Sequence, residues 1–173
     1  METVREVIEK INDCDFVLIG IGDEFKQTGD AEKDKRILDA YNALARIPSG
    51  KPYFVISENE DDLIYDSKLL DFFITCPFSS RGDTKEGEEQ WQTYMRWLSA
   101  TLGHKLCILE LGVGFTKPQL IKFPFEKAAQ YNQKSFMIRV HHSLPMLPEG
   151  LDGRGAAIKT NALDFLLEEQ AEV

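Results

Sequence analysis

Residues 16–22 read Phe16-Val17-Leu18-Ile19-Gly20-Ile21-Gly22, a continuous apolar run that ends in two glycines separated by one residue. An uninterrupted apolar run of this length is typical of a parallel strand that helices cover on both faces. We therefore predict that residues 16–22 form the first core strand.

The remaining elements alternate between strands and helices. Further strands are predicted at residues 53–57, 106–111, 135–140 and 156–159, with a short one at residues 72–75. Helical spacing of apolar residues predicts helices over 4–11, 37–45, 88–102 and 162–169, and one that begins near Pro124. This alternation predicts the α/β class: a Rossmann-like, three-layer arrangement with a mainly parallel sheet and helices on both faces. No linker interrupts it, so residues 1–173 are expected to form a single domain.

The charge balance restricts the partners. The chain has 20 basic and 29 acidic residues and a formal charge of −9, which argues against nucleic-acid or anionic-membrane binding. Small molecules and proteins remain as partners, and the oligomeric state stays open. The chain shows no signal-peptide pattern and no apolar run of the ~18 residues that span a bilayer. A cytoplasmic protein is expected.

The three cysteines are Cys14, Cys76 and Cys107, and each lies in or beside an apolar run. Their wide spacing forms no metal-binding pair, so we expect free, buried thiols.

Glycines and polar residues follow the predicted strands. In a parallel sheet, ligands bind beyond the carboxyl ends of the strands, where the order of connections reverses. Gly20-Ile21-Gly22 and Gly112-Val113-Gly114 lie at two such ends, and glycines there allow close approach of a phosphate. Neither has the rest of a nucleotide fingerprint: the first lacks a third glycine and the second lacks Lys-Ser/Thr. Nucleotide binding and simple turn formation therefore both remain open.

Two longer stretches resemble the sirtuin family of NAD-dependent protein deacylases and ADP-ribosyl-transferring enzymes. Residues 51–61, Lys51-Pro52-Tyr53-Phe54-Val55-Ile56-Ser57-Glu58-Asn59-Glu60-Asp61, are similar to a family strand followed by Thr-Gln-Asn-x-Asp. Residues 106–118 and Pro124-Phe125-Glu126 resemble a bacterial sirtuin-like branch that carries Glu-Leu-Gly-Val-Gly-Phe. The resemblance implies a Rossmann-type domain that binds NAD or ADP-ribose.

The resemblance also assigns residues to the two ends of the cofactor. Toward the nicotinamide and the phosphates it implies roles for five residues: Gly20, Gly22, Phe25, Asn59 and Asp61. Asn59 and Asp61 match the pair that holds the nicotinamide ribose and carboxamide. Toward the pyrophosphate and adenosine it implies roles for four residues: Gly112, Gly114, His141 and Asn161.

The chain departs from the family pattern in two ways. Residues 62–75 contain no histidine where the family has its catalytic base, and the four-cysteine zinc module is reduced to Cys76-Pro77-Phe78-Ser79. A single thiolate cannot build a tetrahedral zinc site, so neither zinc nor another metal is expected. The resemblance thus implies a short, divergent bacterial sirtuin-like protein that lacks the zinc module.

Its implied function is binding of NAD or ADP-ribose without conventional deacylation, and the catalytic residues stay unassigned. If the protein is active, NAD-consuming ADP-ribosyl or acyl transfer is expected. The alternative is a non-catalytic protein-interaction or regulatory module that has lost the cofactor.

Several side chains carry further expectations. His141 and His142 should point to opposite faces of a strand and form a poor metal pair, with no carboxylate nearby in sequence. Glu110 should either form a salt bridge or hydrogen-bond a ribose, and residues 58–62 should form a solvated acidic loop. The apolar stripe of the 88–102 helix should lie in the core (Trp91, Tyr94, Met95, Leu98), with Trp97 facing a cleft or a partner.

Overall fold

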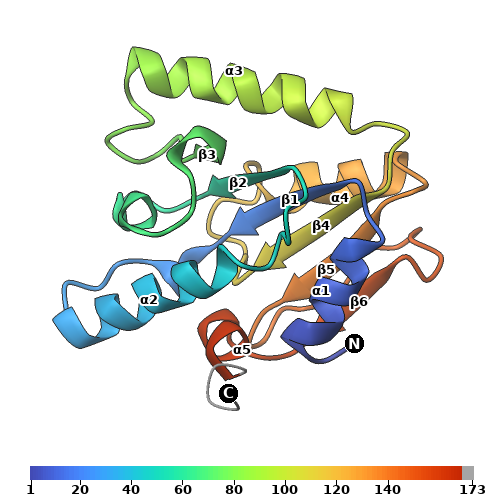
Figure 1. Cartoon of the computed structure of the whole chain (residues 1–173), viewed down its shortest axis with the longest axis horizontal. Helices are drawn as coiled ribbons and strands as arrows, with labels where there is room; N and C mark the ends of the chain where they lie inside the picture. The colour runs from blue at the N-terminus through green and yellow to red at the C-terminus, as the bar shows by residue number, and fades with distance from the viewer. Residues whose placement is uncertain (169–173) are drawn as a thin grey trace.

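The computed structural model describes residues 1–168 and contains a six-stranded parallel sheet (Figure 1). The strands are β1 (Phe16–Ile21), β2 (Tyr53–Ser57), β3 (Ile74–Thr75), β4 (Leu106–Leu111), β5 (Phe136–Val140) and β6 (Gly155–Ile158). They lie in the order β3-β2-β1-β4-β5-β6, and every neighbouring pair is parallel. The predicted α/β, Rossmann-like architecture is confirmed.

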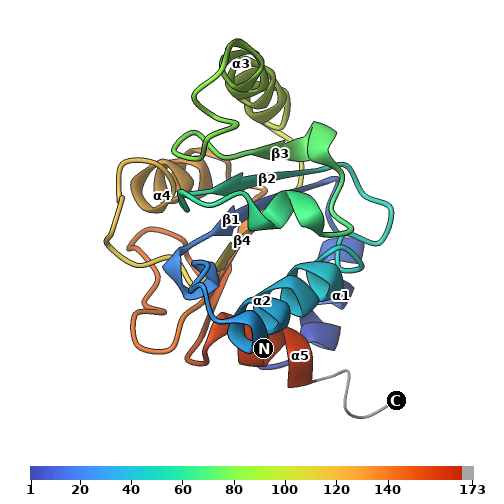
Figure 2. The ribbon, with the colours of Figure 1, turned by 90° about the vertical axis from the view of Figure 1, so that its left-hand side faces the viewer.

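Helices cover both faces of the sheet. The helices α1 (Val4–Asn12), α2 (Ala31–Leu44) and α5 (Ala162–Glu168) pack on one face, and α3 (Lys85–Ala100) and α4 (Lys122–Tyr131) pack on the other. Figure 2 shows α2 and α5 across the sheet from α3 and α4. Each face has its own cluster of buried apolar side chains, because the strand residues alternate between the two faces. The result is the expected three-layer arrangement.

Local signals account for most of the element boundaries. Thr3 and Glu6 form a capping box at the start of α1, and β2 and β4 have the predicted bounds. The predicted strand at residues 72–75 is shorter, because residues 71–73 form a 3-10 turn and only Ile74–Thr75 pair with β2. The predicted end of the last helix at Glu169 lies outside the described residues.

The helix α2 begins at Ala31, six residues before the predicted start at residue 37. Its first turns are polar and exposed, so they carry no apolar pattern. The Asp30 side chain caps this end by accepting a hydrogen bond from the Lys33 amide at 3.0 Å.

The prediction that the apolar stripe of α3 lies in the core is wrong in part. Tyr94 is buried and Trp91 and Leu98 pack against the core, but 42% of Met95 is exposed. The helix lies beside the β3 edge of the sheet (Figure 1), so only a narrow part of its surface meets the core. Trp97 packs against that core, with its ring centroid 5.9 Å from that of Phe16 and 5.7 Å from that of Phe54, and does not face the ligand cleft. Its contact with a partner stays a prediction.

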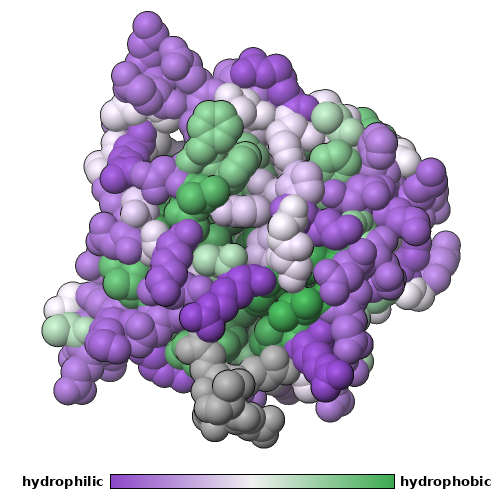
Figure 3. Space-filling model, in the orientation of Figure 1, coloured by the Kyte–Doolittle hydropathy of each residue, from purple (hydrophilic) through white to green (hydrophobic). Residues whose placement is uncertain are grey.

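The surface seen in Figure 3 is mostly hydrophilic, and the cysteines are buried. Hydrophilic side chains cover most of the face in Figure 3, with smaller hydrophobic areas between them. All three cysteines are free and buried, as predicted. Within residues 1–168, none of the helices has both the length and the apolar character that a membrane crossing requires.

The order of strands reverses at β1. The chain moves from β1 to β2 and β3 on one side, and then returns to β4 and β5 on the other. The loops after β1 and β4 therefore diverge at the carboxyl edge of the sheet, which is where ligands bind in open α/β sheets.

Candidate functional site

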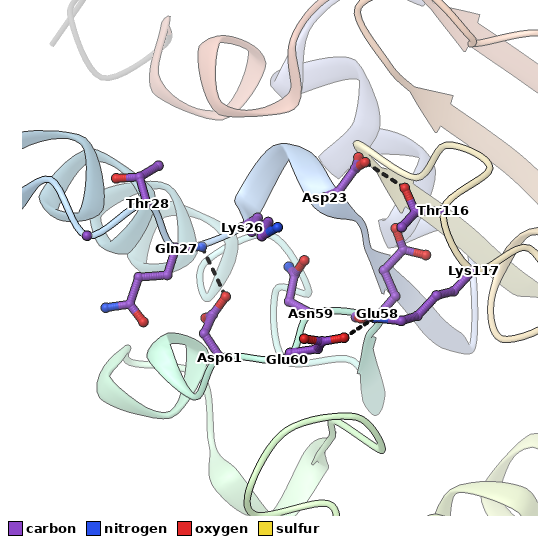
Figure 4. A pocket seen from close by; sticks show the side chains of 11 residues that line it. Asp23, Lys26, Gln27, Thr28, Glu58, Asn59, Glu60, Asp61, Thr116 and Lys117 are labelled. Carbon is purple, nitrogen blue, oxygen red and sulfur yellow. Dashed lines mark hydrogen bonds and ion pairs between the residues drawn. The ribbon is translucent and has the colours of Figure 1, made fainter.

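A pocket of about 780 Å³ lies at the carboxyl ends of β1, β2 and β4 (Figure 4). It is lined by residues from the three loops that follow these strands: Asp23, Lys26, Gln27, Thr28, Gly29, Glu58, Asn59, Glu60, Asp61, Thr116 and Lys117. The pocket is therefore located at the reversal of strand order, the place that the fold predicts for a ligand.

Hydrogen bonds join the three loops across the pocket. The Thr116 hydroxyl donates to the Asp23 carboxylate at 2.8 Å, which connects the loops after β4 and β1. The Lys117 ammonium group donates to the Glu58 carbonyl at 2.9 Å and lies 3.3 Å from the Glu60 carboxylate. These contacts hold the pocket wall in place.

Two of the residues that the resemblance assigned to the cofactor, Asn59 and Asp61, line this pocket. The Asn59 side-chain amide donates to the Gly22 carbonyl at 3.0 Å. The Asp61 carboxylate accepts from the Gln27 amide at 3.0 Å and from the Leu63 amide at 3.2 Å. The structure thus brings both side chains to the end of β1, where a ligand in the pocket would reach them.

The predicted solvated loop at residues 58–62 is wrong for its first two residues. Glu58 is 1% exposed and Asn59 is 5% exposed, because the loops after β1 and β4 cover the end of β2. The sequence of an acidic run shows its charge, but it does not show which of its side chains will be buried in the folded protein.

Glu58 has an unusual environment for a carboxyl group. Neither of its oxygens has a hydrogen-bond partner within residues 1–168, although the Asp23 amide lies near enough to lower its pKa slightly. Burial, with a further contribution from the Asp23 charge, raises the pKa of Glu58 to about 7, although the Lys117 charge opposes the shift. A buried, unpaired carboxyl group with a shifted pKa in a pocket is typical of a functional residue. Our sequence interpretation missed Glu58, and its place directly after a buried strand was the available signal.

The two Gly-x-Gly turns have clear packing roles. A Cβ atom on Gly20 would lie 2.6 Å from the Ile121 side chain, and one on Gly22 would lie 2.0 Å from the Gly112 carbonyl. Gly112 has φ of +66°, and a Cβ there would lie 2.5 Å from Glu24. Close approach of β1 to α4 and to the loop after β4 therefore accounts for these glycines. Their contact with phosphates stays a prediction.

The remaining assigned residues do not line the pocket. Phe25 is fully buried, and its ring centroid lies 4.9 Å from that of Tyr41, so it can offer a ligand only its backbone. The Asn161 side-chain oxygen accepts from the Leu163 amide at 2.9 Å and caps α5. A Cβ on Gly114 would be 3.4 Å from the His141 ring. Cofactor roles for these residues stay predictions.

Part of the chain is similar in sequence to a known protein. No protein-family model matches the chain. A 69-residue segment, 40% of the chain, is 28% identical to a protein ADP-ribosyltransferase of Staphylococcus aureus strain Mu50. This segment resembles an ADP-ribosyltransferase. It corresponds to 22% of that protein's length, and the narrower assignment to sirtuins stays a prediction.

A second cluster at the same edge of the sheet contains Glu24, His141 and His142. The prediction that the histidines point to opposite faces is wrong, because both follow Val140, where β5 ends. Their rings stack with centroids 4.5 Å apart. The Glu24 carboxylate, which arrives from the loop after β1, lies 3.1 Å from His142 Nδ1 and 3.7 Å from His141 Nε2.

The hydrogen bonds of this cluster do not suit a metal ion. His141 Nδ1 accepts from the Ser143 and Leu144 amides at 3.1 and 2.9 Å, which places the proton of the neutral ring on Nε2. Burial lowers the pKa of His141 and favours this neutral form. A ring nitrogen that binds a metal needs a free lone pair, but the lone pair of His141 Nδ1 is occupied by the two amides and Nε2 carries the proton. Glu24 also accepts from the Ala162 amide at 2.8 Å, so the cluster joins β5, α5 and the loop after β1.

Glu110 forms a salt bridge, one of its two expected roles. Its carboxylate binds the Arg139 guanidinium with two contacts, of 2.5 and 3.1 Å, and both side chains are buried. Arg139 also binds Glu126 at 3.0 Å and the Met146 carbonyl at 2.6 Å. Since these partners satisfy Glu110, its role is structural and a ribose contact is not needed to explain its burial.

Proposed function

We propose that this protein binds NAD or ADP-ribose in the pocket at the ends of β1, β2 and β4, as a sirtuin-like relative of ADP-ribosyltransferases. The observation that carries the proposal is the position of Asn59 and Asp61 together in a pocket at the reversal of strand order. The similarity to a protein ADP-ribosyltransferase supports the choice of ligand.

The chemistry of the pocket matches the nicotinamide end of the cofactor. An amide side chain such as Asn59 can both donate to and accept from a carboxamide, and a carboxylate such as Asp61 accepts from ribose hydroxyl groups. The pocket also carries the carboxyl groups of Asp23 and Glu60, which favour the positively charged nicotinamide ring. Lys26 and Lys117 supply positive charge for phosphate oxygens.

Binding of NAD and ADP-ribose to the purified chain tests the proposal by isothermal titration up to millimolar ligand. We expect Asn59→Ala to weaken binding by about tenfold, which corresponds to the loss of one or two hydrogen bonds. Asn132→Ala is the matched control, because Asn132 is also buried and donates to two backbone carbonyls, but it precedes β5 at the opposite edge of the sheet.

Two results would contradict the proposal. One is the absence of binding of either nucleotide at millimolar concentration, which would favour the alternative of a protein-interaction or regulatory module without a cofactor. The other is equal weakening by Asn59→Ala and Asn132→Ala, which would place the binding site elsewhere.

A further inference from the structure

We infer that Glu58 is the proton acceptor of this site. In this role it takes the proton of a hydroxyl group, water being the simplest, that attacks the anomeric carbon of the nicotinamide ribose. The inference rests on the proposed function and assigns a catalytic residue where the sequence analysis found none, since residues 62–75 contain no histidine.

The position of Glu58 is the first argument. Its side chain extends from the end of β2 toward Asp23 and Thr116 at the wall of the pocket (Figure 4). The residue is 1% exposed, and both carboxyl oxygens lack a hydrogen-bond partner within residues 1–168. Buried polar groups are normally satisfied, so an orphaned pair of oxygens beside a pocket indicates a group that a ligand completes.

The comparison with Glu110 strengthens this argument. Both are buried glutamates near the carboxyl edge of the sheet, but Glu110 has a two-point contact with Arg139, whereas the Glu58 carboxyl group has no partner among residues 1–168. The nearest positive group, Lys117, donates instead to the Glu58 backbone carbonyl. Glu58 is therefore kept unpaired while a neighbouring buried carboxylate is neutralised.

The charges around Glu58 determine its protonation. Asp23, on the loop after β1, and Glu110, on β4, favour the neutral acid, whereas Lys117, after β4, and Lys122, on α4, favour the carboxylate. With burial, these charges leave the pKa of Glu58 at about 7, which suits a general base at neutral pH. A carboxylate with an ordinary pKa would be a weaker base.

The proposed step needs no reactant besides NAD and the attacking hydroxyl group. An electron pair of the hydroxyl oxygen forms the new bond to the anomeric carbon as the bond to nicotinamide breaks. The electron pair of that bond stays on the ring nitrogen, so the cationic ring leaves as neutral nicotinamide. The hydroxyl proton passes to the Glu58 carboxylate and then to solvent.

Nicotinamide release from NAD by the full chain, measured chromatographically between pH 5.5 and 8.5, tests the inference. We expect the rate to rise by up to about tenfold per pH unit below pH 7 and to level off above it. Glu58→Gln keeps the shape of the side chain but cannot accept the proton. We expect it to lower the rate by about 100-fold or more and to remove the rise with pH, while the NAD affinity changes less than about threefold. Glu88→Gln, at an exposed position of α3, is the control and should match the original chain.

The possible results distinguish the catalytic role of Glu58 from the proposed binding of NAD or ADP-ribose. If Glu58→Gln releases nicotinamide at the original rate, the role of Glu58 is overturned. If the original chain binds NAD but releases no nicotinamide, the inference is overturned and the proposed binding function stands. If the chain binds ADP-ribose but not NAD, the inference alone is overturned. If neither nucleotide binds, both are overturned.

Discussion

At the scale of single residues, Glu58 links function to stability. Its pKa of about 7 exceeds its ordinary value of 4.5, because burial penalises the charged form. The folded chain therefore holds this proton more tightly than the unfolded chain. The contribution to stability is complete below pH 4.5 and is lost as the pH rises through about 7.

Replacement of Glu58 by a neutral side chain of the same shape tests this sign. Glu58→Gln should increase the free energy of unfolding at pH 8 by up to about 3 kcal/mol, because it removes the buried charge. The gain should be much smaller at pH 5, where the original glutamate is neutral. Urea unfolding at both pH values measures the difference.

The neighbouring Glu60→Gln is the control for this experiment. The Glu60 side chain is 77% exposed and its ion pair with Lys117 lies at the surface, so its replacement should change stability by less than about 1 kcal/mol. A loss of stability in Glu58→Gln at pH 8 would contradict the environment that we describe.

At the scale of elements, the buried pair of Glu110 and Arg139 joins two central strands. The two residues are register partners on β4 and β5, and their side chains are 0% and 1% exposed. A buried pair adds little net stability compared with apolar residues, but removal of one partner leaves an uncompensated charge.

We expect Glu110→Ala to lower the free energy of unfolding by about 3–5 kcal/mol, because Arg139 then keeps only Glu126 and the Met146 carbonyl as partners. Replacement of both residues, as Glu110→Leu with Arg139→Met, should recover most of that loss. Urea unfolding of the single and double variants measures both effects. A double variant that is less stable than Glu110→Ala would show that the pair itself stabilises the sheet.

At the scale of the whole molecule, the pocket depends on three loops that are distant in sequence. The loops after β1, β2 and β4 contribute Asp23, Glu58 and Lys117, and the unfolded chain does not keep them together. A ligand of the pocket should thus bind the folded chain alone and stabilise it by mass action.

We therefore expect NAD or ADP-ribose at 100 times its dissociation constant to stabilise the folded chain by about 2.7 kcal/mol. For a chain of this size, that gain corresponds to a rise of about 5–10 °C in the melting temperature. Thermal unfolding at a series of ligand concentrations measures the rise. A melting temperature that does not change with ligand would contradict binding in the pocket.

Parts of the candidate site were predictable from local signals. The ends of β2 and β4 were located by their apolar runs. Asn59 and Asp61, which follow β2, line the pocket, and their contact with a cofactor stays a prediction. The burial of Glu58 was not predictable, because it depends on cover from the loops after β1 and β4. Glu24 contacts His142 although the two residues are 118 positions apart, and sequence spacing cannot predict a contact over that separation.

The α/β class, the central strands and the capping box of α1 were predictable from the sequence, because apolar periodicity and capping act between residues a few positions apart. Tertiary contacts determine which polar side chains are buried and which of them find partners. Glu110 contacts Arg139 through strand pairing, and Trp97 contacts Phe16 and Phe54 through packing of α3. The Glu58 carboxyl group is buried with no partner in the part of the chain that the structure describes. Burial and pairing of this kind arise from contacts between distant segments, and those contacts exist only once the sheet has assembled.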